Sequence, residues 1–133
     1  LQGRSLRIAN WEPGTWTLWI DAWPFAPYVR EGVELGDEDV DLGTLKTSDG
    51  ASFVARWRTQ AGEEAPRLTV LVGREGPPPS VRRVDRVEGG VARVTGLGPG
   101  DHRVVVHAEP GGRVLDEVIA LDGTSTVERT VGP

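Results

Sequence analysis

Histidine is the side chain best suited to acid–base chemistry near neutral pH, and the chain holds only two, His102 and His107. Both fall on one predicted strand. Because side chains alternate between the two faces of a strand, an odd separation directs the imidazoles to opposite faces, where they cannot share a metal ion or a substrate. The chain also lacks cysteine and any Gly-x-Ser-x-Gly sequence that would present a serine nucleophile. We therefore predict no enzyme activity and no cofactor.

Alternating aspartates form the one string that resembles a metal site. Asp37, Asp39 and Asp41 follow one another in GDEDVDLG, as the oxygen ligands of a calcium loop do. The glycine of such a loop comes one place late, at Gly43, and the twelfth position is Ser48 where glutamate is required. We favour an acidic loop at a junction between two modules over a structural calcium site.

Aromatic side chains are concentrated in the segment Ile8–Val29, which holds four of the five tryptophans. Trp19 belongs to the outward-facing set of its predicted strand, and three more aromatic residues follow in the proline-stiffened WPFAPYV. Tryptophan and tyrosine are favoured where one protein surface meets another, and their rings can also stack on sugars. We expect packing against a neighbouring domain, with polysaccharide binding as the alternative. The candidate binding residues are Trp19, Trp23, Phe25 and Tyr28.

The other three tryptophans are predicted to be structural. Trp16 shares a strand face with Leu18, and Trp57 shares one with Phe53. Trp11 also occupies a position that would be used for packing. Large aromatic side chains dominate the burial of apolar surface in protein cores, so we expect these three rings to be buried.

Alternation of apolar and polar residues predicts an all-β fold. Eighteen glycines and ten prolines separate short valine-rich runs, and no window repeats apolar residues at helical spacing. About seven short strands per module, divided by turns, are typical of an antiparallel β-sandwich. The GLGPGD glycines are expected to permit positive φ in a hairpin turn. The predicted inward-facing residues include Phe53, Ala55, Leu68, Val70, Val72, Ala92, Val94, His102, Val104, Val106, Ala108, Leu115, Ile119, Leu121, Val127 and Val131.

The chain contains an internal repeat. Shifted by 86 residues, Ile8–Leu35 lies on Val94–Leu121 without a gap. Residues 1–47 are then predicted to be the C-terminal half of a first β-sandwich module, and residues 48–133 a complete second module. Half a sandwich cannot bury its own inner face, so we expect the missing strands to come from outside this region or from another chain, as in a strand-exchanged homodimer. Matching pairs include Pro13 with Pro99, Gly14 with Gly100, Leu18 with Val104, Ile20 with Val106, and Ala22 with Ala108.

The second copy resembles the carboxypeptidase regulatory-like domain, which has an Ig-like/transthyretin-like β-sandwich of seven strands. The resemblance rests on a pattern of glycines, alternating apolar residues and Pro–Gly–x–aromatic, and it places His102 where an aromatic residue such as tyrosine is usual. It implies a non-catalytic structural or protein-interaction module of a larger extracytoplasmic protein, whether periplasmic, cell-surface or secreted. The pattern residues are Gly90, Ala92, Val94, Gly96, Leu97, Pro99, Gly100, His102, Val104, Val106 and Ala108.

Charge and hydropathy restrict the partners further. The net charge is −5 with both signs interspersed, which argues against nucleic acid, and the arginines of VRRVDRV are expected to form a solvated strand face. No run of apolar residues reaches the length needed for insertion into a membrane. The expected partners are therefore neighbouring domains of the same parent protein or another protein, with polysaccharide as the alternative.

Overall fold

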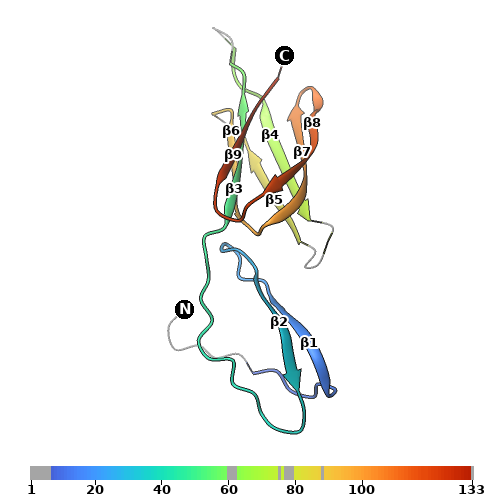
Figure 1. Cartoon of the computed structure of the whole chain (residues 1–133). Coiled ribbons are helices and arrows are strands. Elements are labelled where there is room, and N and C mark those ends of the chain that lie inside the picture. Colours follow the sequence, from blue (N-terminus) through green and yellow to red (C-terminus); the bar gives the residue numbers. More distant parts are fainter. Residues whose placement is uncertain (1–6, 60–62, 75, 77–79, 88, 133) are drawn as a thin grey trace.

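The computed structural model describes residues 7–59, 63–74, 76, 80–87 and 89–132. Within these residues the chain forms nine β-strands and no helix, which confirms the predicted all-β class (Figure 1). The strands are β1 (Gly14–Ile20), β2 (Tyr28–Leu35), β3 (Ala51–Trp57), β4 (Arg67–Arg74), β5 (Ser80–Arg86), β6 (Val91–Leu97), β7 (Gly100–Glu109), β8 (Gly112–Leu121) and β9 (Thr126–Val131).

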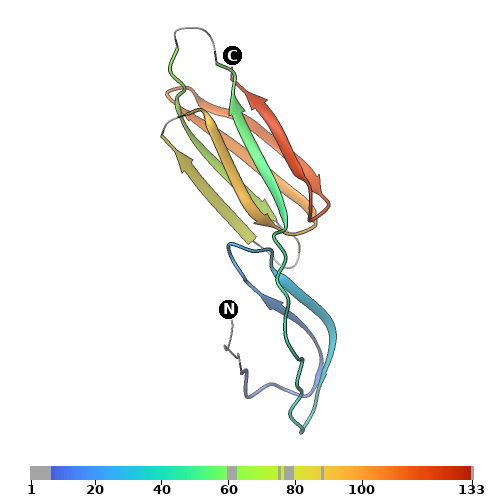
Figure 2. The same ribbon diagram turned by 90° about the vertical axis from the view of Figure 1, so that its left-hand side faces the viewer.

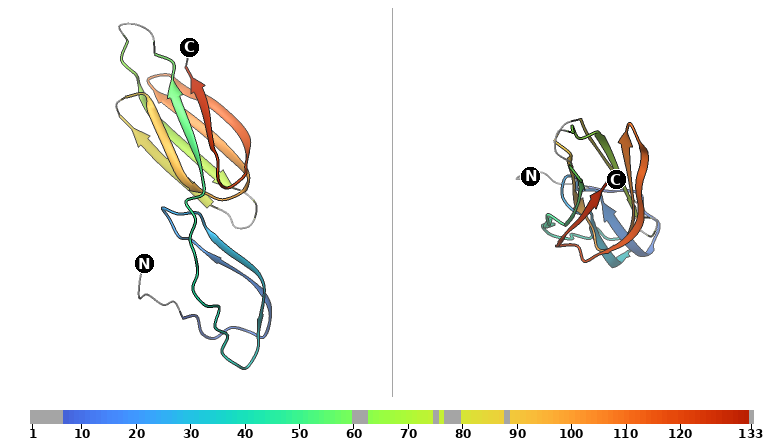
Figure 3. Two further views of the ribbon diagram at one scale, coloured as in Figure 1. Left: turned by 60° about the vertical axis from the view of Figure 1, so that its left-hand side comes forward. Right: turned by 90° about the horizontal axis from the view of Figure 1, so that it is seen from above.

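Strands β3 to β9 form a sandwich of two sheets (Figure 2). One sheet has three strands in the order β6-β3-β9, and the other has four in the order β5-β4-β7-β8. Neighbouring strands are antiparallel, except that β3 and β9 run parallel. Strands β1 and β2 form a separate antiparallel hairpin, which continues the long axis of the sandwich (Figure 3).

The hydrophobic core lies between the two sheets of the sandwich. Every second residue of β4 and β7 is buried, whereas β3 is buried at five consecutive residues, Ala51–Ala55. The predicted inward-facing residues lie in this core, with Phe53 as the largest side chain, except that Leu115 and Val127 are half-buried against it. Strand β7 illustrates the pattern, because every second residue from His102 to Ala108 faces the core. Apolar burial of this kind provides most of the favourable free energy of folding. The core residues are Ala51, Phe53, Ala55, Leu68, Val70, Val72, Ala92, Val94, Leu97, Val104, Val106, Ala108, Ile119, Leu121 and Val131.

The glycine-rich loop between β6 and β7 corrects one expectation. These two strands belong to different sheets, so GLGPGD crosses from one layer to the other and is not a hairpin turn. Two of its three glycines do take positive φ, 71° at Gly96 and 118° at Gly100. Loop composition predicted the backbone conformation, because glycine alone adopts such angles without steric cost. It carried no information about which sheet the next strand would join.

The β1–β2 hairpin has one face that is only half covered. Trp16, Leu18 and Ile20 share this face and are half-buried, because no second sheet lies opposite them among the described residues. Trp11 remains 39% exposed and packs edge-on against Trp16, with ring centroids 5.0 Å apart. The prediction of a buried ring is therefore wrong for Trp11, whereas Trp16 is half-buried and the two rings pack on each other. Trp57 is also half-buried, and its packing against the sandwich core agrees with a structural role.

The start of the hairpin repeats the strand register of β7–β8 as well as its apolar pattern. The first three residue pairs of the two hairpins are related by the same shift of 86 residues. The register then shifts between Trp16 and Leu18 in β1–β2, whereas in β7–β8 it stays regular as far as Val106 and shifts between Val106 and His107. Asn10, which precedes β1 as Gly96 precedes β7, has φ of 65° against 71° for the glycine. The pairs are Gly14–Leu35, Thr15–Glu34 and Trp16–Val33 in one hairpin, and Gly100–Leu121, Asp101–Ala120 and His102–Ile119 in the other.

A candidate functional site at the hairpin–sandwich junction

The turn between β1 and β2, residues 21–27, lies against the loops at one end of the sandwich (Figure 1). We call it the junction turn. A Cβ atom placed on Gly96 would lie only 2.4 Å from the carbonyl oxygen of Pro24, and one placed on Gly50 would lie 2.9 Å from the Cβ of Ala26. Both distances are shorter than any ordinary contact, so the two glycines allow the turn to approach this closely. Ala26 is buried and its N–H donates to the Ser48 carbonyl oxygen at 2.9 Å.

An ion pair joins the junction turn to β5. Nη2 of Arg82 donates to Oδ1 of Asp21 at 2.9 Å. The arginine side chain is only 11% exposed whereas the aspartate is 69% exposed, and Nε of Arg82 is buried without a hydrogen-bond partner in the described part of the chain. The hydrogen bond from Arg82 lowers the pKa of Asp21, and a second bond from the Trp23 N–H lowers it further. The pair therefore supplies the principal charge compensation for a mostly buried guanidinium.

The four candidate aromatic residues do not form one platform. Trp19, Trp23 and Phe25 are 45%, 66% and 42% exposed, and Trp19 lies on the outward face, as its parity predicted. Tyr28 pairs with Ile20 on the opposite face of the hairpin and is half-buried. The rings of Trp19 and Phe25 line two different grooves beside the junction turn.

The first groove lies between the junction turn and the outer face of the three-stranded sheet. It encloses about 440 Å³. The ring of Phe25 forms one wall, and Asp49 and Arg93 contribute charged groups. Such a mixture of one aromatic ring with hydroxyl and charged groups can hydrogen-bond a polar ligand. Its lining is completed by Pro24, Gly50, Ser52, Thr95, Thr124 and Thr126.

The second groove lies between the hairpin and the start of β5. Trp19 and Pro27 provide apolar surface on the hairpin side, and Val81 provides it on the sandwich side. The groove encloses about 400 Å³ and contains the Asp21–Arg82 ion pair. The charges of Asp21 and Arg82 neutralise one another, so the groove has little net charge to attract a charged ligand. Its lining is better suited to packing of side chains across the junction.

The two histidines lie on opposite faces of β7, as predicted. His102 is buried in the core and its Nδ1–H donates to the carbonyl oxygen of Gly100 at 3.0 Å. Burial lowers the pKa of His102, because the charged imidazolium is poorly solvated in the core. His107 is half-buried on the other face. The imidazoles therefore do not converge on a common position.

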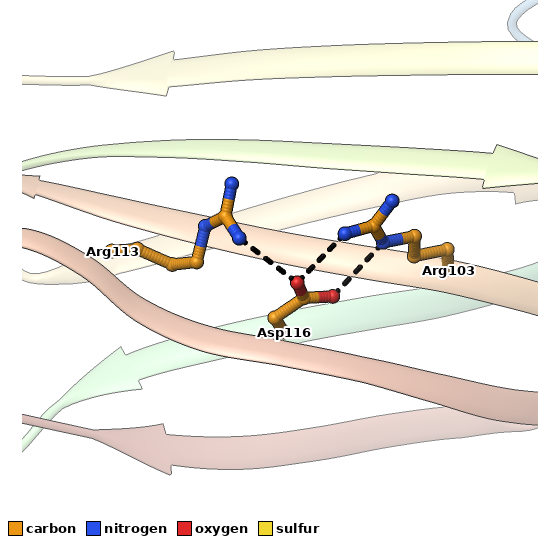
Figure 4. Close-up of polar contacts among 3 residues, drawn as sticks. All are labelled: Arg103, Arg113 and Asp116. Carbon is orange, nitrogen blue, oxygen red and sulfur yellow. Dashed lines mark hydrogen bonds and ion pairs between the residues drawn. The ribbon is translucent and has the colours of Figure 1, made fainter.

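On the outer face of β7–β8, Asp116 forms ion pairs with two arginines, Arg103 and Arg113 (Figure 4). Nε and Nη2 of Arg103 donate to the two oxygens of Asp116 at 3.0 and 2.8 Å, and Nη1 of Arg113 donates at 3.1 Å. The bond from Arg103 lowers the pKa of Asp116. A carboxylate held ionised in this way is a poor general acid, and its bidentate geometry instead fixes the two strands relative to each other.

The acidic string lies at the end of the hairpin that is remote from the sandwich, not at the junction between the two (Figure 1). Asp37, Asp39 and Asp41 are exposed, and Oδ1 of Asp41 accepts the Gly43 N–H at 2.8 Å. Within the described ranges, no group of three His, Cys, Asp or Glu side chains is arranged to hold a metal ion.

Sequence reasoning missed the residues that make the junction. Arg82 lies in a predicted solvated strand face, and it pairs with an aspartate 61 residues away.

Comparison with protein-family models, curated proteins and solved structures found no match to this chain. The described residues also include no helix that is long and apolar enough to cross a membrane.

Proposed function

We propose that this chain is a non-enzymatic structural and protein-interaction module of a larger extracytoplasmic protein, related to the carboxypeptidase regulatory-like domain. It would act by setting the spacing and orientation of neighbouring modules and by presenting their surfaces. The observation that carries this proposal is the close packing of the junction turn against Gly96 and Gly50.

Three kinds of contact support a defined junction within seven residues of chain. Backbone carbonyl groups of the turn lie over Gly96, a backbone hydrogen bond links Ala26 to Ser48, and an ion pair links Asp21 to Arg82. A flexible linker between independent modules would have none of these contacts, because polar composition alone keeps such a segment solvated. The hairpin is therefore proposed to be held at a fixed angle on the sandwich.

The test replaces Gly96 with asparagine and uses Gly89→Asn as the matched control. Both glycines have positive φ, which asparagine tolerates, but a Cβ atom meets Pro24 only at Gly96 and meets nothing within 4 Å at Gly89. Backbone ¹⁵N relaxation should give one correlation time for hairpin and sandwich in the unsubstituted chain and in Gly89→Asn. Gly96→Asn should give a shorter correlation time for the hairpin. Separate correlation times in the unsubstituted chain would refute the proposal.

Polysaccharide binding is the second candidate, and the three exposed rings in the segment from Trp19 to Phe25 favour it. The test is intrinsic tryptophan fluorescence during titration with soluble polysaccharides, repeated on Trp19→Ala, Trp23→Ala and Phe25→Ala. Val118→Ala, which removes an exposed side chain from β8, is the control. Saturable quenching that is lost only in the aromatic variants would support this function. An unchanged emission spectrum across the panel would count against it.

A further inference from the structure

We propose that the outer edge of β1 accepts one further antiparallel strand with the pattern of β4, supplied by a module of the same fold. The hairpin would then occupy the place of β7–β8 in that module. This inference rests on the proposed function, because it names the partner through which one module joins the next.

Strand pairing identifies the position that this partner would fill. Strand β7 has a neighbour on each side, β8 on one and β4 on the other. Its pairing with β4 is continuous from Arg67–Glu109 to Gly73–Arg103. Strand β1 repeats the apolar alternation of β7 and the first three pairs of its register with the following strand, yet β2 is its only neighbour among the described residues. The edge that corresponds to the β4-facing edge of β7 is thus unfilled.

Burial points to the same partner. On β7, His102, Val104 and Val106 are almost fully buried beneath the three-stranded sheet. Their counterparts on β1 are Trp16, Leu18 and Ile20, which are all half-buried. These apolar side chains have the parity of an inner face, and a second sheet would cover them as it covers β7.

Charge also favours a strand of the β4 type. The sequence of β1, GTWTLWI, has no charged residue, whereas the other edge strands, β2, β5, β6, β8 and β9, each contain at least one. Charged residues protect natural sheet edges from further pairing, so β1 lacks this protection. Strand β4 is uncharged from Leu68 to Gly73 and matches β1 in this respect.

The repeat also fixes the register of the added strand. Because Val70 pairs with Val106 and Val72 with Val104, the shift of 86 residues places the corresponding residues of the partner opposite Ile20 and Leu18. Main-chain hydrogen bonds would provide affinity, and the apolar residues opposite these two positions would provide specificity.

The experiment uses the full chain and a capped synthetic peptide with the β4 sequence, RLTVLVGR. Titration into ¹⁵N-labelled protein should shift the β1 amide signals saturably, whereas a scrambled peptide should not shift them. Leu18→Lys should weaken binding by about tenfold or more, because it places a charge on the face to be covered. The matched control, Thr17→Lys, puts the same charge on the exposed face and should bind as the unsubstituted chain does.

Three results would overturn this inference. The β1 signals could remain unshifted at millimolar peptide, the scrambled peptide could bind equally well, or concentration-dependent self-association could show that β1 pairs with β1 of a second copy and not with a β4-type strand. Sandwich signals that remain unchanged in both lysine variants would show that loss of binding does not reflect unfolding. The relaxation test with Gly96→Asn measures only how firmly the junction turn is held on the sandwich. A negative result there would refute the proposed function, whereas a negative peptide titration would refute only the strand-addition proposal.

Discussion

Leu121 and Leu35 occupy the same position in the two copies of the repeat, and their replacement by alanine should have very different effects on stability. Leu121 is 6% exposed in the sandwich core. Removing a buried leucine side chain and leaving a cavity costs about 2–5 kcal/mol. A sandwich of this size has a free energy of unfolding of about 4–12 kcal/mol, so Leu121→Ala should remove a large part of it. The melting temperature should fall by about 10 °C or more.

Leu35 lies at the end of β2, half-buried, and no second sheet faces the hairpin in the described part of the chain. Full burial of a leucine is worth about 1.5–3 kcal/mol, so a half-buried one should contribute about 0.8–1.5 kcal/mol, and here that contribution falls on the hairpin and not on the sandwich. Leu35→Ala should therefore leave the unfolding of the sandwich almost unchanged.

Urea unfolding followed by circular dichroism measures both variants against the unsubstituted chain. The difference between them is decisive, because both substitutions remove the same atoms from the same repeat position. Equal destabilisation would refute the reasoning, since it would mean that the apolar face of the hairpin is packed as completely as the sandwich core.

Two pH-dependent predictions follow. Burial lowers the pKa of His102 below its ordinary 6.5, so on acidification the unfolded chain binds a proton before the folded chain does. The free energy of unfolding should therefore fall as the pH drops below 6.5. Urea unfolding of His102→Phe should lack this loss. The hydrogen bond from Arg82 lowers the pKa of Asp21 below 3.8, so the junction should hold above that pH and loosen as the pH falls through the lowered value. Asp21→Ala should loosen it at neutral pH too, as relaxation of the hairpin signals would show; a rigid junction in Asp21→Ala would contradict the role of the ion pair.

The sequence was sufficient to predict the inner faces of the sandwich, because a strand with one buried face must alternate. Val70, Val72, Val104 and Val106 follow this rule and are buried. The assignment of strands to sheets could not be obtained in this way. GLGPGD has the composition of a hairpin turn, but long-range pairing of β6 with β3 decides that it crosses between layers.

The parity of Trp16 was also predictable, whereas its burial was not. Alternation determines which way a side chain points, but burial depends on whether another sheet lies opposite, and that is a property of the whole assembly. The contact of Arg82 with Asp21 joins residues distant in sequence, and no local pattern indicates it. Gly96 was visible as one of the pattern glycines of the second copy, but its role in admitting the junction turn depends on the backbone of the β1–β2 hairpin, which is distant in sequence.

Amide hydrogen exchange in the unsubstituted chain tests most directly whether the hairpin is a copy of β7–β8 with one edge unfilled. Strand β7 has neighbours on both sides, so its amides should be protected throughout. The β1 amides that face away from β2 should exchange at rates close to those of an unstructured peptide. Protection of these outward amides to the level of β7, in dilute and monomeric protein, would contradict the account.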